Sequence, residues 1–174
     1  MMTKWARFNI YLLSTAALLL ICGCQSPDKA RKKQVTQISF HLETNQDGTD
    51  HNESVPVYRE NPIYVNVEKK AFIDEGSIDQ AKLVDDMGGF SIQLKLNWEG
   101  TQLLQGVSTG NRGKRVAILA VFGKSPRWLG APVMNKSIAD GVFTFTPDAS
   151  REEAERIVRG LNNLSQAIKK DESW

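Results

Sequence analysis

Cysteine and histidine are scarce in this sequence. Its 174 residues include two cysteines, Cys22 and Cys24, and two histidines, His41 and His51. Two cysteines cannot form a disulfide framework. Two cysteines and two histidines are also a poor set of metal ligands or catalytic bases. The acidic pairs at 74–75 and 85–86 are typical of solvated turns, because neighbours in sequence point apart. We therefore expect no enzyme activity, no metal and no cofactor.

A long hydrophobic run is also missing. The apolar stretch at 10–21 is about a dozen residues long and is interrupted by Ser14 and Thr15, whereas a membrane-spanning helix needs roughly 20 residues. Lys4 and Arg7 precede this stretch, as in the positive n-region of a secretory leader. Residues 1–23 are therefore predicted to be a signal peptide rather than a permanent membrane anchor.

The leader ends in Ile21-Cys22-Gly23-Cys24, which resembles the lipobox of bacterial lipoproteins. The resemblance implies that the Cys24 thiol carries a diacylglycerol and that residues 24–34 form a lipidated N-terminus and a hydrophilic tether. The protein is thus expected to be anchored in a membrane of the cell envelope and to face the periplasm, with the bilayer as its partner through acylated Cys24. Gln25 resembles the outer-membrane sorting pattern better than the inner-membrane one.

Neither sign of charge is in excess once the leader is removed. The whole chain has 22 Lys and Arg against 20 Asp and Glu, and the leader contains Lys4 and Arg7, which leaves 20 against 20. A neutral mature protein gives no basis for nucleic-acid binding. The short basic run at 29–33 in the tether either lies on anionic lipid headgroups or is solvated.

The remaining residues, 35–170, predict a single α+β domain with a mixed or antiparallel sheet and two or three helices. Alternating apolar residues and one near-continuous apolar run predict strands at 35–42, 63–67, 90–96, 115–122 and 142–146. Gly, Pro and polar side chains predict loops at 44–56 and 123–132. Helices are expected at 77–82, leading into another strand, and at 98–109.

The strongest local pattern is at the C-terminus. Ser150 and Glu153 form a capping box, in which each side chain is expected to bond the backbone N–H of the other residue. Apolar residues then recur at helical spacing: Ala154, Ile157, Val158, Leu161, Leu164 and Ile168. This pattern predicts an amphipathic helix that packs on the sheet through one apolar stripe.

The order of motifs over residues 62–162 resembles the first periplasmic domain of SecD, a subunit of the bacterial preprotein translocase, and in particular its head region. The matching features are a strand at 90–96, a helix at 100–109, the turn Gly113-Lys114-Arg115, Ala131-Pro132-Val133, Ile138-Ala139-Asp140-Gly141 and Glu153-Ala154. The membrane spans of SecD have no counterpart in this sequence. The resemblance therefore implies contact with an unfolded or emerging polypeptide and no motor function.

The expected function is non-catalytic binding of unfolded polypeptide or of an envelope protein partner during export. The alternative is a structural or self-assembling envelope lipoprotein with no export role. A hydrophobic groove between sheet and helix would favour the first function, and an exposed unpaired strand would favour the second.

The candidate contact surface consists of Arg127, Trp128 and Leu129. A large aromatic beside a cation, in a segment bounded by Gly and Pro, is a common form of recognition anchor. Trp128 either forms such an exposed anchor or folds back over the sheet as a core residue. Trp98 is expected to be an ordinary packing residue.

Overall fold

The computed structural model describes residues 31, 34–46, 48–123 and 125–171. The chain divides into two units, Met1–Lys32 and Lys33–Trp174, and the helices and strands named below belong to the second unit. The predicted signal peptide, Cys24 and most of the predicted tether lie outside the described residues. Within the described ranges, no helix combines the length and the apolar character that a membrane span requires.

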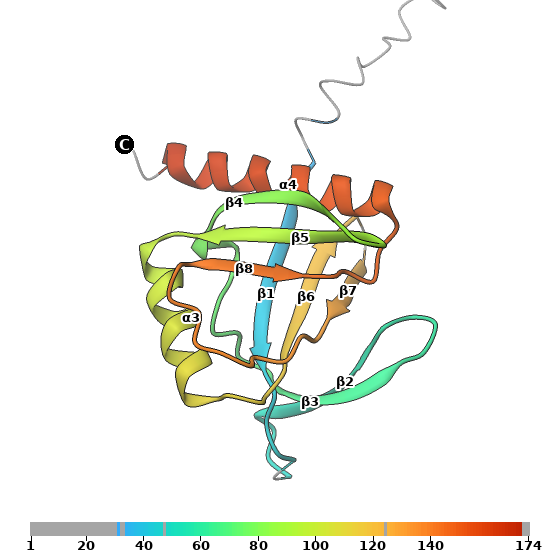
Figure 1. The fold of residues 1–174 in the computed structure, drawn as a ribbon, viewed down its shortest axis with the longest axis vertical. Helices are drawn as coiled ribbons and strands as arrows, with labels where there is room; N and C mark the ends of the chain where they lie inside the picture. The colour runs from blue at the N-terminus through green and yellow to red at the C-terminus, as the bar shows by residue number, and fades with distance from the viewer. Residues whose placement is uncertain (1–30, 32–33, 47, 124, 172–174) are drawn as a thin grey trace, which may run out of the picture. The chain divides into compact units, whose positions relative to one another are not determined.

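The second unit is an α+β fold, as the pattern predicted (Figure 1). Its described residues form three antiparallel sheets, where a single sheet was expected, and two α-helices. The first sheet has the order β1-β6-β7, and its strands are Thr36–Leu42, Val116–Phe122 and Ser125–Gly130. The second has the order β4-β5-β8, and its strands are Ile78–Asp86, Gly89–Leu96 and Val142–Phe145. The third is a ribbon of β2 (Asn52–Val57) and β3 (Ile63–Glu68). The helices are α3 (Trp98–Gly110) and α4 (Arg151–Asp171), and Glu75–Ser77 forms a 3-10 turn.

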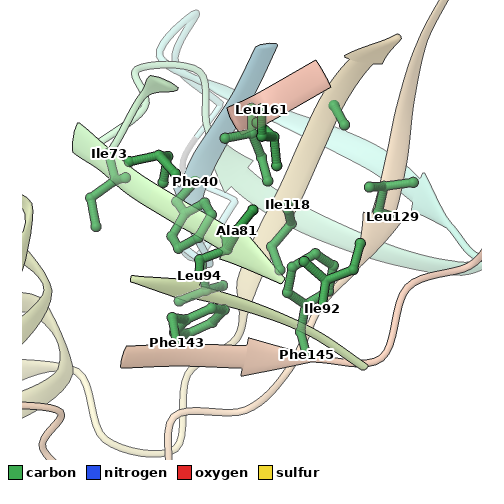
Figure 2. Close-up of a cluster of buried hydrophobic side chains, with 14 of the residues drawn as sticks. Phe40, Ile73, Ala81, Ile92, Leu94, Ile118, Leu129, Phe143, Phe145 and Leu161 are labelled. Atoms are coloured by element: carbon green, nitrogen blue, oxygen red, sulfur yellow. The ribbon is translucent and has the colours of Figure 1, made fainter. Parts of the chain in front are cut away.

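The main core lies between the β1-β6-β7 and β4-β5-β8 sheets, whose strands cross steeply (Figure 1). Alternation along each strand turns one set of apolar side chains inward. Figure 2 shows Phe40 of β1 and Ile118 of β6 among Ile92 and Leu94 of β5. The ring of Phe40 lies 4.9 Å from that of Phe143 on β8, centroid to centroid. Contacts of this kind hold the two sheets together.

A second, smaller core lies on the other face of the β1-β6-β7 sheet. There the ribbon packs its inward-facing valines against the sheet: Val55, Val57, Val65 and Val67. Ala117 of β6 is fully buried on this side, whereas its neighbours Val116 and Ile118 belong to the main core. Because β6 is covered on both faces, its sequence is almost continuously apolar.

Helix α4 begins with the predicted capping box. The backbone N–H of Glu153 donates to Ser150 Oγ at 3.2 Å, and that of Ser150 donates to Glu153 Oε2 at 3.0 Å. The helix buries Ala154, Ile157 and Leu161 against the sheets, as its apolar stripe predicted.

Two predicted loops contain strands. In the segment 44–56, β2 begins at Asn52, and in the segment 123–132, β7 runs from Ser125 to Gly130. Both strands contain a proline, Pro56 and Pro126, and proline is tolerated in strands that lie at a sheet edge. Both segments are strands because β2 pairs with β3 and β7 pairs with β6. The local sequence pattern does not show this pairing.

The predicted helix at 77–82 is also wrong. The 3-10 turn ends at Ser77, and β4 starts at Ile78. The pairing register with β5 shifts between Ile78 and Gln80, so that Ile78 and Ala81 both face the core although they are three residues apart. This three-residue spacing imitates the period of a helix.

Gly160 lets α4 lie against β1, which yields the first prediction. A Cβ atom at this position would meet Thr36 Oγ1, and it would lie 2.8 Å from the Thr36 backbone nitrogen. We expect Gly160→Ala to lower the free energy of unfolding by roughly 1–3 kcal/mol in urea titrations, because the helix must shift. Gly106→Ala in α3 is the matched control, because nothing lies within 4 Å of a Cβ there. It should raise stability by about 0.5–1 kcal/mol. Equal effects of the two variants would contradict the close contact.

Candidate functional site

The residues of the predicted contact surface lie on β7. Leu129 is fully buried in the main core, so it supports the strand and offers no surface. Arg127 and Trp128 are half-buried. Because successive side chains of a strand point to opposite faces, Trp128 lies on the ribbon side of the sheet and its two neighbours lie on the other. The structure therefore does not bring the three side chains together on one face.

Trp128 packs against the valines of the second core. Its ring also lies edge-on to that of His41, at 5.2 Å between centroids. His41 is buried, with Nδ1 2.9 Å from the Glu68 carbonyl oxygen and Nε2 2.9 Å from Ser39 Oγ. The tryptophan and the histidine thus join the ribbon to the β1-β6-β7 sheet.

Arg127 forms a forked ion pair with Glu153. Its Nη1 and Nη2 donate to the two carboxylate oxygens, each at 3.1 Å, and its guanidinium carbon lies 4.7 Å from the centre of the Phe122 ring. This bond lowers the pKa of Glu153 from its usual value of 4.5 to about 2, and the backbone N–H of Ser150 contributes to the shift. The pair fixes the first turn of α4 on β7.

Arg59, which follows the ribbon strand β2, joins the same group of charges. Its backbone N–H and its Nε donate to Asp148 Oδ2 at 2.9 and 3.2 Å, and its Nη2 lies 3.6 Å from Glu153 Oε2. The carboxylates are thus used within the domain, and they connect the ribbon, β7 and α4.

A hollow of about 670 Å³ lies beside β8. Its volume falls within the roughly 300–1,000 Å³ that is typical of ligand pockets. One wall is β8 itself, and the other is the segment 132–140, which connects β7 to β8. The lining residues are Pro132, Val133, Met134, Asn135, Lys136, Ser137, Ile138, Ala139, Asp140, Val142, Phe143 and Thr144.

The outer wall of the hollow is fixed to the body of the domain. The backbone N–H of Val116 donates to the Pro132 carbonyl oxygen at 3.0 Å, and that of Met134 donates to the Lys114 carbonyl oxygen at 2.9 Å. The backbone N–H of Ile138 donates to Ser108 Oγ of α3 at 2.9 Å. The hollow is therefore a formed feature of the fold.

The two edges of the β4-β5-β8 sheet differ in what covers them. At the β4 edge, Asn162 of α4 accepts from the backbone N–H of Ala81 at 2.8 Å and donates to the Ala81 carbonyl oxygen at 2.9 Å. Ser165 donates to the Asp79 carbonyl oxygen at 2.9 Å. The β8 edge is the one that borders the hollow.

Most of the side chains that we considered for catalysis have hydrogen-bond partners within the domain. His41 is hydrogen-bonded to Ser39 and to the Glu68 carbonyl oxygen, and His51 is exposed just before β2. Asp74 accepts from the backbone N–H of Gly76 at 3.0 Å, and Asp85 accepts from Arg151 at 2.6 Å. In the part of the chain that the structure describes, no three His, Cys, Asp or Glu side chains are grouped as metal ligands.

Two exposed aromatics and the hollow were missed by sequence reasoning. Trp98 was expected to pack, yet 79% of its surface is exposed, and Tyr64 on the ribbon is 73% exposed. Residues of two motifs that carry the resemblance line the hollow, namely Pro132, Val133, Ile138, Ala139 and Asp140, but the motifs did not predict it. The sequence held no signal for the strand order that leaves β8 at an edge.

Comparisons with known proteins show the fold. A solved chain of SecDF, described as a membrane component that enhances protein export, is 19% identical with a TM-score of 0.57; the match covers 82% of this chain and 71% of that chain. SecDF in a super-membrane-facing form is 20% identical with a TM-score of 0.57, over 81% of this chain and 21% of that chain. No family model matches, and no curated protein is significantly similar. The predicted resemblance is confirmed as a SecDF-like fold.

The second prediction concerns the charge of Glu153. Because its pKa is lowered in the fold, its ionised form stabilises the protein above pH 4.5, and this stabilisation is lost as the pH falls toward 2. Glu153→Gln can keep the capping bonds but removes the charge. We expect it to lower the free energy of unfolding at pH 7 by roughly 1–3 kcal/mol.

Urea unfolding of wild type and variant between pH 7 and pH 2 measures this effect. The difference in stability should narrow as the pH falls below 4.5. Glu155→Gln is the control on the same helix, because Glu155 is half-exposed and its oxygen lies 3.9 Å from Arg151. It should change stability by less than about 0.5 kcal/mol. A pH-independent difference for Glu153→Gln would contradict the assigned ion pair.

Proposed function

We propose that this protein is a lipid-anchored envelope protein whose SecDF-like domain contacts exported polypeptides in the hollow beside β8. The observation that carries the proposal is the hollow itself, with fixed walls and a sheet edge on one side, in a fold similar to that of SecDF. SecDF is described as a membrane component that enhances protein export. We propose that a lipid anchor holds the domain at a membrane in that setting.

The proposed anchor is the lipid on Cys24, the residue that directly follows the predicted leader at 1–23. The first described residues of the domain contact α4. Asn163 of α4 donates to the Gln34 carbonyl oxygen at 2.9 Å, and Arg159 donates to Gln34 Oε1 at 3.2 Å. Gln34 thus lies beside α4, which covers the β4 edge of the β4-β5-β8 sheet (Figure 1). The hollow borders the opposite edge of that sheet.

We propose that the protein acts by binding and not by catalysis. The hollow is lined by apolar and neutral polar side chains, and its two charged residues, Lys136 and Asp140, balance each other. Such a lining fits a polypeptide better than a nucleic acid, which requires a basic surface. We place the domain on the periplasmic side of a membrane, and Gln25 favours the outer membrane over the inner one.

An assembly role is the second candidate, and exposed apolar side chains favour it. Tyr64 and Trp98 are 73% and 79% exposed, and Met87 at the turn between β4 and β5 is fully exposed. Aromatic side chains are enriched at protein interfaces. Tyr64 lies on the ribbon, and Met87 and Trp98 lie near opposite ends of β5, so the three side chains are separate contact points. A structural envelope lipoprotein that assembles through these residues would need no export role.

The third prediction separates these functions by photo-crosslinking in cells. A photoreactive residue replaces Val133, which lines the hollow and is 37% exposed, or Gln166, which is exposed on α4 and serves as the control. We expect position 133 to capture many different exported proteins, identified by mass spectrometry, and position 166 to capture few. Exchanging residues 1–24 for a secretory leader that is cleaved without lipidation, which removes Cys24, should release the protein from the membrane and reduce this capture.

Each other outcome contradicts a part of the proposal. Capture of a single defined partner at position 133 favours the assembly role. Equal capture at both positions, or none at either, refutes polypeptide binding in the hollow. Membrane attachment that survives the exchange of residues 1–24 refutes the lipid anchor.

A further inference from the structure

We propose that the β8 edge binds its polypeptide as an added antiparallel or parallel strand, so that the β4-β5-β8 sheet gains a fourth strand inside the hollow. The inference rests on the proposed function and specifies how the same site would recognise its ligand. Recognition would then depend on main-chain hydrogen bonds rather than on side-chain sequence.

The direction of the β8 backbone groups follows from its pairing with β5. The backbone N–H of Leu96 donates to the Gly141 carbonyl oxygen at 2.9 Å, which makes these two residues a hydrogen-bonded pair. Bonded and non-bonded pairs alternate along an antiparallel ladder. Phe143, opposite Leu94, therefore bonds to β5, whereas Val142 and Thr144 turn their N–H and C=O groups away from β5 and toward the free edge.

The bond made by Val142 supports this direction independently. Its backbone N–H donates to Asp140 Oδ1 at 3.1 Å, which lies off the ladder. The Asp140 side chain thus caps the first outward N–H of the strand. The next outward N–H belongs to Thr144, which lines the hollow, and its C=O faces the same side. Val142 and Thr144, the two residues whose main-chain groups turn away from β5, both line the hollow.

The opposite edge of the same sheet shows how an edge is closed in this protein. At β4, the Asn162 amide donates and accepts as the main chain of a neighbouring strand would, and Ser165 bonds the next outward carbonyl. Side chains of α4 thus satisfy outward-facing main-chain donors and acceptors of β4. An edge that is not closed in this way is a template for another strand.

The occupant that fits the β8 edge is a single extended polypeptide segment. The edge is recessed, because the wall at 132–140 stands across the hollow from it. A second folded copy would carry the same wall in front of its own β8, so two such edges could not approach each other. A lone extended chain is thin enough to enter, and the balanced charges of Lys136 and Asp140 do not select for either sign.

The fourth prediction compares two substitutions at Thr144. Both Thr144→Pro and Thr144→Val remove the oxygen that accepts from Gln93 Nε2 at 3.3 Å, but only proline removes the outward N–H. Proline is tolerated at a sheet edge when its missing N–H faces away from the partner strand. The two variants therefore form a matched pair.

The probe is a short synthetic peptide that alternates valine with threonine between terminal lysines, and isothermal titration calorimetry with the purified, unacylated domain measures its affinity. We expect Thr144→Val to bind like wild type and Thr144→Pro to bind roughly tenfold more weakly. The same peptide with N-methyl groups on alternate residues should bind the wild-type protein about as weakly as the unmethylated peptide binds Thr144→Pro. This measurement tests the main-chain hydrogen bonds without any change to the protein.

The other results overturn the inference in distinguishable ways. Tight binding of the N-methylated peptide, or equal binding by the two variants, refutes strand addition but leaves polypeptide binding in the hollow intact. No binding of the peptide by wild type, together with no binding of a permanently unfolded protein, refutes the proposed function as well. Dimers in sedimentation that Thr144→Pro abolishes would show that the occupant is a second copy of this chain.

Discussion

Main-chain N–H and C=O groups that leave water must find partners, and at the outer edge of β4 those partners are side chains of α4. Asn162 provides two of the bonds and Ser165 a third. For these contacts to form, α4 has to lie at a fixed distance and in a fixed rotation beside the sheet. The position of this helix is the constraint on which the rest of the structure depends.

Two features hold the helix in that position. At its start, Glu153 completes the capping box and accepts both bonds of the Arg127 fork, so the first turn is tied to β7. In its middle, the absence of a side chain at Gly160 allows the backbone to approach Thr36 of β1. With α4 fixed across β1 and β4, one edge of the β4-β5-β8 sheet is closed, and the opposite edge at β8 borders the hollow.

Much of this fold could be predicted because the relevant signals are local. The capping box and the apolar stripe of α4 involve residues within a few turns of each other, and β1, β5 and β6 carry clear apolar patterns. Three segments could not be predicted because their structure depends on distant partners. The ribbon strand β2 and the strand β7 contain prolines, and the shifted register at Ile78 gives β4 a helix-like spacing.

Prediction of the candidate site from sequence fails for the same reason, because the site depends on residues that are distant in the chain. Arg127, Trp128 and Leu129 are adjacent in sequence, but on a strand neighbours face opposite ways, and each side chain has partners inside the domain. The hollow is formed by β8 and a connecting segment that become neighbours only in the folded chain. The segment 132–140 stands across the hollow from the β8 edge, and for this reason we proposed an extended ligand there rather than a second folded copy.

Hydrogen exchange of individual backbone amides, measured by NMR on the free domain, tests the central claim most directly. The account predicts slow exchange at Ala81, whose N–H is bonded to Asn162, and at Phe143, whose N–H faces β5. It predicts fast exchange at Thr144, whose N–H faces the hollow. Exchange at Thr144 as slow as at Phe143 would contradict an open β8 edge, and fast exchange at Ala81 would contradict its closure by α4.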